Sequence, residues 1–279
     1  TIQSNIPMVQ TKQKMRNQAI IRLITEQGFM RIEALAQRFG VAPQTIRRDV
    51  RALCDQGLLR RYYGGVGRLE FPRENLTFDR RQMLYPIERR SIAKAVVNRI
   101  PDGSSLSLGI GTTPCYVAEA LTAHHDLLVV TPNLRAAEIL AQNSDCRIVL
   151  PGGEIRNRHR DIDLRAAADL CGRYRVDFAI MGVGGIDNDG TLLDFDHEEV
   201  NLRLAMVAHA RERILIADHA KIGRAAPAPG GSLQDIDRFV TDTPPPAELE
   251  TALRHEGVVI DAADTPVGAA SELPTEVVR

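Results

Sequence analysis

A chain of 279 residues is long enough for about two domains, and its 44% hydrophobic and 25% charged residues exclude a mainly disordered protein. The net charge of −1 conceals an asymmetry, because residues 1–90 carry 17 Lys and Arg against 8 Asp and Glu, whereas the remainder carries 18 against 28. This basic first part and acidic remainder predict that only the first part meets nucleic acid.

Membrane insertion, secretion and metal binding are not predicted. No apolar run reaches the roughly 18 residues of a membrane span, and the N-terminus lacks a signal-peptide core. The histidines are scattered, and the cysteines at 54, 115, 146 and 171 form no C-x-x-C pair. We therefore expect a cytoplasmic protein with reduced thiols, no metal, no cofactor and no membrane partner.

Two amphipathic helices are predicted before residue 40. Apolar residues recur at helical spacing within 20–24 and again within 32–39. Phe39-Gly40-Val41 then predicts a tight turn into a third helix. Helix, short glycine-containing turn and helix is the order of a helix-turn-helix, so the third helix is expected to enter a DNA groove.

That third helix, predicted over 42–57, has two contrasting faces. Ile46, Val50 and Leu53 form an apolar stripe. The opposite strip carries guanidinium and amide groups, which pair with base edges in the major groove. Pro43 suits the first helical position and Gly57 suits the end. The alternative interpretation is a solvated basic helix on a small bundle.

Residues 58–66 predict two short strands around Gly64-Gly65, a wing that follows the helix. Its basic and tyrosine side chains are expected to contact backbone phosphates. A winged helix-turn-helix DNA-binding domain over 1–66 results. The DNA-contacting residues that we predict are Gln44, Thr45, Arg47, Arg48 and Arg51 on the helix, and Arg60, Arg61 and Tyr62 on the wing.

Residues 67–90 are charged, contain prolines and are predicted to be a linker, and residues 91–261 alternate strands with helices. Such alternation predicts an α/β domain whose mainly parallel sheet is covered on both faces. Residues 262–279 are predicted to be a disordered tail. Strands are predicted at 105–108, 127–131, 147–150, 177–183, 213–217, 238–241 and 258–261, and helices at 116–122, 134–142, 198–210 and 247–255.

The ends of four predicted strands are rich in Gly, Thr and Asn: 109–114, 131–133, 151–156 and 182–187. Ligands of parallel sheets bind beyond these carboxyl ends. In 109–114, glycines permit close backbone approach, hydroxyls donate, and the following helix N-terminus favours an anion. A phosphorylated ligand is therefore predicted, the alternative being plain strand–helix turns.

Carboxylates at 194, 196, 198 and 199 precede a predicted helix, and Lys221 follows a predicted strand. These groups suit sugar hydroxyls and a phosphate, or proton transfer on a carbonyl sugar. The simpler alternative is that the acids complement the helix dipole and the lysine is solvated.

The chain resembles the DeoR/GlpR family of bacterial transcriptional regulators over nearly its whole length. Thr45-Ile46-Arg47-Arg48-Asp49 carries the head motif, with Gly64-Gly65 as the wing turn. Gly111-Thr112-Thr113, Gly152-Gly153, Gly185-Ile186-Asp187 and Asp218-x-x-Lys221-x-Gly223 match the family's sensor domain in the right order.

The resemblance implies a sensor fold similar to ribose-5-phosphate isomerase, a sugar phosphate or related metabolite as effector, and repression of a carbohydrate operon. Two departures, Gly109 and Pro132, lie in the expected ligand pocket, so the resemblance does not identify the effector. The effector-binding residues that it implies are Gly111, Thr112, Thr113, Asn133, Gly152, Gly153, Asp187, Glu199 and Lys221.

Residues 224–232, rich in Pro and Gly, are predicted to be a loop that either closes over ligand or is disordered.

The function expected is that of a transcription factor, not an enzyme, that binds double-stranded operator DNA under the control of a phosphorylated sugar. One small head offers few base contacts, so a homo-oligomer, dimer or tetramer, is expected. Two alternatives stay open: a sugar-phosphate isomerase with a DNA-binding head, and a DNA-binding protein whose body only oligomerises.

Overall fold

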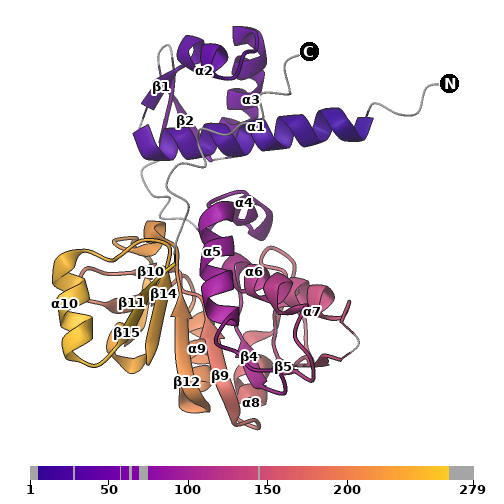
Figure 1. The fold of residues 1–279 in the computed structure, drawn as a ribbon, viewed down its shortest axis with the longest axis vertical. Helices are drawn as coiled ribbons and strands as arrows, with labels where there is room; N and C mark the ends of the chain where they lie inside the picture. Colours follow the sequence, from indigo (N-terminus) through magenta and orange to yellow (C-terminus); the bar gives the residue numbers. More distant parts are fainter. Residues whose placement is uncertain are drawn as a thin grey trace. The chain divides into compact units, whose positions relative to one another are not determined.

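The computed structural model describes residues 6–27, 29–56, 58–62, 65–68, 75–143 and 145–263. The chain divides into two compact units, which we call the head (residues 1–72 and 79–85) and the body (residues 73–78 and 86–279). In Figure 1 the head is indigo and the body runs from magenta to yellow. No helix within the described ranges is long and apolar enough to cross a membrane.

The head contains the predicted helices and wing. Its elements are α1 (Ile6–Gln27), β1 (Phe29–Arg31), α2 (Ile32–Arg38), α3 (Pro43–Asp55), β2 (Leu59–Tyr62) and β3 (Gly65–Arg68). The wing strands pair antiparallel, and β1, which the sequence analysis missed, adds a third strand in the order β1-β3-β2. The helices and this sheet enclose one apolar cluster that includes Ile24, Leu35 and Leu53. Gly57 and Gly64 lie outside the described residues.

A seven-stranded parallel sheet forms the centre of the body, in the order β15-β14-β12-β9-β4-β5-β6. The chain starts at β4, moves outward through β5 and β6, then returns to the other side of β4 and continues outward from β9. Its strands are β4 (Ser105–Leu108), β5 (Leu128–Val130), β6 (Arg147–Val149), β9 (Val176–Met181), β12 (Ala210–Ile216), β14 (Arg238–Thr241) and β15 (Val259–Ala262).

Helices cover both faces of this sheet, as predicted. Alternate strand residues belong to two separate apolar clusters, because successive side chains of a strand point to opposite faces. Leu106 and Ile180 lie in the cluster with α5 (Pro86–Val97), α6 (Thr112–Leu121) and α7 (Leu134–Leu140). Phe239 and Leu215 lie in the cluster with α8 (Leu164–Cys171), α9 (His197–Ala208) and α10 (Ala247–His255).

All seven strands predicted in the body are present, with ends shifted by up to three residues, whereas α8 and two small sheets were not predicted. One small sheet is the hairpin β7 (Ile155–Arg156) and β8 (Asp161–Ile162). The other has the order β10-β11-β13 and joins β10 (Gly185–Ile186), β11 (Thr191–Asp194) and β13 (Ala228–Ser232).

The prediction of a loop over 224–232 is wrong for its second half, since residues 228–232 form β13 on β11. The glycines serve packing and not mobility. Gly230 lies against Val200 of α9, where a Cβ atom would overlap the valine side chain, and its carbonyl accepts a 2.6 Å hydrogen bond from Arg203.

The segment predicted as a linker, 67–90, contains helical structure. The short helix α4 spans Phe78–Gln82, and α5 starts at Pro86, within the predicted linker. A proline at the first helical position lacks only an N–H that would have no helical partner, so it starts a helix well. The body's first helix therefore begins before the predicted domain boundary at residue 91.

Candidate functional site

The predicted DNA-binding residues of α3 lie together on the surface of the head. They line a groove of about 440 Å³, the α3 groove, with one wing residue, Arg61. The side chains of Arg47 and Arg51 are 50% and 78% exposed, and Arg60 is also exposed. The side chain of Tyr62 lies outside the description. The α3 groove is lined by Gln44, Thr45, Arg47, Arg48, Arg51 and Arg61.

Local sequence explains this orientation of α3. Ile46, Val50 and Leu53 are at most 2% exposed and hold one face on the head's core. Asp49 is fully buried and accepts hydrogen bonds from Arg16 at 2.6 Å and from Gln13 at 3.1 Å, both on α1. The sequence analysis missed this ion pair, although an acidic residue among arginines on a helix is a signal that it has an internal partner.

The body's sheet reverses its direction of growth between β4 and β9. Loops at such a switch point separate and leave a crevice at the carboxyl ends of the strands. Gly109 follows β4 there and donates to the Ile180 carbonyl at 2.9 Å. A Cβ atom on Gly109 would lie 3.3 Å from that carbonyl oxygen, so the close approach favours glycine.

The loop of residues 109–111, the β4 loop, leads into the N-terminus of α6. Gly111 has a φ of 104°, a conformation that favours glycine, and it precedes the first helical residue. Thr112 and Thr113 occupy the first turn and are 5% and 6% exposed. Unpaired N–H groups and the helix dipole make such a terminus a site for an anion, and the threonine hydroxyls add donors.

Asn133 supports the β4 loop from behind. Its side chain is 1% exposed, and Nδ2 donates to the Gly109 and Gly111 carbonyls at 3.3 and 2.9 Å. Its Oδ1 accepts from the Ala136 N–H at 3.1 Å and so caps α7. This asparagine therefore fixes the position of the loop.

Lys221 lies in a short 3₁₀ turn (His219–Lys221) after β12 and extends toward the end of β9, with Nζ 3.5 Å from the Gly184 carbonyl oxygen. Asp218, which precedes it, is buried and 3.1 Å from Arg89 Nε. Burial raises the pKa of Asp218, but the charges of Arg89, Lys221 and His219 outweigh burial and lower it. Asp218 is thus an ionised anchor for the turn that carries Lys221.

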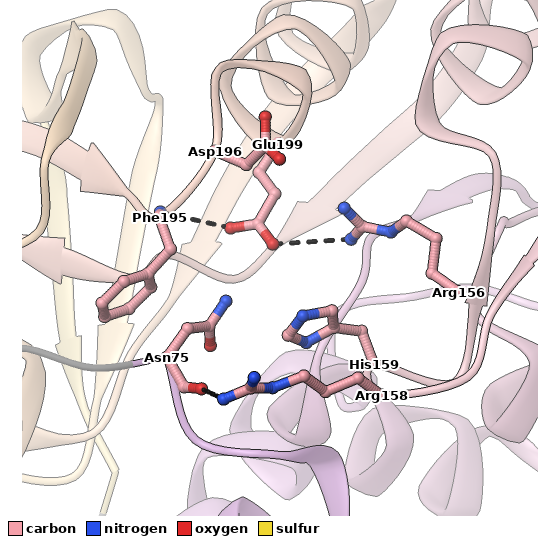
Figure 2. Close-up of a pocket in the computed structure, with 7 residues that line it drawn as sticks. All are labelled: Asn75, Arg156, Arg158, His159, Phe195, Asp196 and Glu199. Atoms are coloured by element: carbon pink, nitrogen blue, oxygen red, sulfur yellow. Dashed lines mark hydrogen bonds and ion pairs between the residues drawn. The ribbon is translucent and has the colours of Figure 1, made fainter.

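A second cavity of the body, of about 520 Å³, contains the predicted residue Glu199. Figure 2 shows its lining residues arranged around a common space, with α9 on one side and the β7–β8 loop on the other. We call it the polar pocket; it is lined by Asn75, Arg156, Arg158, His159, Phe195, Asp196 and Glu199.

An ion-pair chain builds one wall of the polar pocket. Arg156 donates to both carboxylate oxygens of Asp161, at 2.7 and 3.1 Å, and lies 3.5 Å from Glu199 Oε1. Asp161 pairs through its backbone with Asn133, the residue that holds the β4 loop. Arg156, Arg158 and His159 were not among the residues predicted from the sequence, although three basic residue types within four positions were a usable signal.

The remaining predicted effector residues lie at the rim of the body's sheet. Gly152 and Gly153 are exposed between β6 and β7, and Gly153 has a φ of 124° and packs against Asp163. Asp187 is exposed after β10, and its Oδ1 accepts from the Asn188 N–H at 2.8 Å. None of the three lines the polar pocket as the structure describes it.

A winged helix-turn-helix with an exposed arginine groove, joined to a separate parallel α/β domain, defines a DNA-binding transcriptional regulator. A family model for the DeoR-like helix-turn-helix domain matches residues 16–70, and one for the DeoR C-terminal sensor domain matches residues 86–243. The chain belongs to the DeoR family.

Relatives and solved structures are similar over different extents. The glycerol-3-phosphate regulon repressor of Escherichia coli (strain K12) is 40% identical, with 90% of this chain and 99% of the relative covered. The repressor CsqR of the same organism is 38% identical, over 88% of this chain and 94% of the relative. Ribose-5-phosphate isomerase from Plasmodium falciparum is 15% identical, over 49% of this chain and 52% of the isomerase, with a TM-score of 0.35.

Proposed function

We propose that this regulator is a repressor whose affinity for operator DNA changes when the body binds a phosphorylated sugar or polyol. The observation that carries the proposal is the β4 loop, placed at the switch point of the sheet in front of the N-terminus of α6. The relatives named as glycerol-3-phosphate regulon repressors support the choice of a phosphorylated metabolite.

In this proposal the phosphate lies against the N-terminal turn of α6. The N–H groups and hydroxyls of Thr112 and Thr113 donate to it, and Lys221 supplies a positive charge from the turn after β12, two strands away from β4 in the sheet. Glu199 accepts hydrogen bonds from hydroxyl groups. The rim of the effector site includes Gly152, Gly153 and Asp187. Asn133 supports phosphate binding indirectly, because its side chain holds Gly111 in place.

On the DNA side, helix α3 enters the major groove of the operator. There the groove is read by residues of α3: Gln44, Thr45, Arg47, Arg48 and Arg51. Arg60, Arg61 and Tyr62 of the wing contact the DNA backbone. One α3 groove buries little surface, so we propose that a dimer or tetramer places two or more heads on repeated half-sites.

The test is a thermal-shift panel on the full chain with glycerol 3-phosphate, ribose 5-phosphate and fructose 6-phosphate, each beside its unphosphorylated counterpart. A ligand bound only by the native state at 100 times its Kd adds about 2.7 kcal/mol to stability. We expect at least one phosphorylated compound to raise the Tm and to change operator affinity in a gel shift. No shift with any of them contradicts the proposal.

Thr113→Val is the matched variant, since it keeps the shape of the side chain and removes the hydroxyl. It should weaken binding of the active compound, whereas Thr122→Val at the other end of α6, where the hydroxyl bonds the Glu119 carbonyl, should not. The same compounds should be recovered unchanged after incubation, because a sensor binds its ligand without consuming it. Formation of an isomer would favour the enzymatic alternative.

A further inference from the structure

One wall of the polar pocket comes from the first described residues of the body, 75–78, which directly precede residues 79–85 of the head in the sequence. Asn75 lines it, and Figure 2 shows its side chain projecting into the space between Phe195 and His159. Residues 73–78 belong to the body, whereas residues 79–85 belong to the head. Asn75 is therefore four positions in the chain from the point where the head resumes.

Arg158 fastens this segment to the body at two points. Its guanidinium Nη2 donates to the Asn75 carbonyl at 2.7 Å, and its own carbonyl accepts from the Phe78 N–H at 3.0 Å. The Phe78 side chain is 3% exposed and lies in the body's apolar cluster. Arg158 thus binds the backbone at Asn75, and the Asn75 side chain lines the pocket.

The charge of the polar pocket argues against a second phosphate site. Two carboxylates, Asp196 and Glu199, line it beside two guanidinium groups, so the formal charges of the lining cancel when His159 is neutral. Arg156 already has Asp161 and Glu199 as partners. A phosphate dianion bound in the polar pocket would lie close to two carboxylates and be repelled by them. No such repulsion is expected at the N-terminus of α6.

Hydroxyl groups are the complementary ligand chemistry. A hydroxyl both donates and accepts, and the pocket offers carboxylate acceptors, guanidinium donors and the Asn75 amide, which is both. Phe195 supplies an apolar surface for carbon–hydrogen groups. A volume of about 520 Å³ lies within the range of small-molecule sites.

We propose that the polar pocket binds the hydroxyl-bearing part of the effector, and that Asn75 is a specificity-determining residue that contacts those hydroxyls directly. The proposal rests on the proposed function, since it concerns the same ligand. It names the ligand class as a phosphorylated polyol or sugar, and it makes Asn75, near the start of the body, part of the binding site.

The experiment compares ligands with and without hydroxyls on the full chain. Isothermal titration measures the affinity of glycerol 3-phosphate, ribose 5-phosphate and fructose 6-phosphate against n-propyl phosphate, which has a phosphate and carbon chain but no hydroxyl. One lost hydrogen bond lowers affinity by about 3- to 10-fold. We expect Asn75→Ala to lower the affinity for the tightest-binding hydroxylated compound by that factor and to leave the affinity for n-propyl phosphate unchanged. The preference, which is the ratio of these two affinities, falls by the same factor.

The variants are chosen to separate contact from structure. Asn75→Ala retains the backbone carbonyl that Arg158 binds, so this hydrogen bond remains. Asn75→Asp keeps the size and replaces the amide donor by an acceptor, and should also change the preference. Asn98→Ala, an exposed asparagine at the end of α5, is the control and should change neither affinity.

The outcomes distinguish the two proposals. If phosphorylated compounds stabilise the wild type but Asn75→Ala leaves the preference unchanged, or lowers all affinities equally, the assignment of Asn75 is wrong and the proposed function stands. If n-propyl phosphate binds the wild type as tightly as every hydroxylated compound, the pocket does not read hydroxyls. If no phosphorylated compound binds, the proposed function fails and this inference fails with it.

Discussion

The arginines of α3 in the head and the buried arginines of the body differ in exposure and in partners. On α3 the side chains of Arg47 and Arg51 are half or more exposed, with acidic neighbours no closer than 3.4 and 4.0 Å. In the body, Arg203 and Arg89 are 4% and 3% exposed and lie 2.6 and 3.1 Å from Asp194 and Asp218. The first two side chains are accessible to an external partner, whereas the last two hold the internal structure of the body.

Exposed and buried guanidinium groups contribute to different properties of the protein. Exposed guanidinium groups keep their hydration until a polyanion replaces it, so their contribution is to binding and falls with salt. Buried guanidinium groups have already lost water and depend on their carboxylate partners, so their contribution is to the position of loops. Substitutions should therefore separate into losses of affinity in the head and losses of stability in the body.

The largest expected effect is that of Asp194→Ala. Asp194 holds Arg203 through two bonds of 2.6 and 3.2 Å and also accepts from the Gly184 N–H at 2.8 Å. Its removal leaves a buried guanidinium without its charge partner, which costs about 3–5 kcal/mol. Urea unfolding followed by far-UV circular dichroism measures the change, since the chain has no tryptophan.

An exposed pair of the body is the control for Asp194→Ala. Arg165 and Glu198 are 2.8 Å apart, with Arg165 82% exposed. Arg165→Ala should cost at most about 1 kcal/mol. If both variants lost the same free energy of unfolding, the contribution of the body's ion pairs to stability would not depend on their burial.

Arg48→Ala should weaken operator binding by about 5- to 150-fold without changing the free energy of unfolding, because one bidentate base contact is worth about 1–3 kcal/mol and the side chain is exposed. Gel shifts with specific and scrambled DNA measure it. Arg38→Ala, an exposed arginine of α2 outside the α3 groove, is the matched control. A similar loss for Arg38→Ala would show that charge alone binds DNA.

Gly230→Ala extends the comparison from charge to packing. The added methyl group would overlap Val200 on α9, and overpacking of this kind costs about 1–3 kcal/mol. Gly152→Ala is the control, since its Cβ position has no atom within 4 Å, and it should change stability by less than about 0.5 kcal/mol. A stable Gly230→Ala protein would show that β13 can move away from α9.

The smallest expected effect is a pH dependence confined to the body, because all seven histidines lie beyond residue 90. A 2.6 Å hydrogen bond from His219 to Asp242 raises the pKa of His219, although burial opposes the rise. The folded pKa therefore exceeds the unfolded value of 6.5, so the stabilisation is complete below that value. It is lost as pH rises through the folded pKa.

Unfolding free energies measured across this window should fall with rising pH in the wild type and less steeply in Asp242→Asn. His255→Gln removes a histidine that is 88% exposed and should leave the slope unchanged. An unaltered slope in Asp242→Asn would disprove the assignment to His219.

The sequence predicted those features that local patterns determine. Helical spacing oriented α3, because Ile46 and Val50 must face a core, and apolar runs located every strand of the large sheet. Features that depend on distant partners were missed. Asp49 became interpretable only beside Arg16, 33 positions away, and Asn75 entered a pocket only because Arg158, 83 positions away, holds its backbone. The effector residues remain predictions, although the structure brings Glu199 into a pocket and Thr112 to a switch point.

Asn133 has one more consequence, for the thermodynamics of binding. Its amide donates to the Gly109 and Gly111 carbonyls, so the protein's own groups hold the β4 loop. On the proposed function, these bonds lower the conformational entropy that phosphate binding has to offset in that segment. On the proposed function, a loop fixed in this way contributes affinity for the phosphate but little movement, so the coupling to DNA binding has to come from other parts of the body. We therefore expect Asn133→Ala to lower the affinity for the effector and to leave the operator affinity of the protein without added effector unchanged.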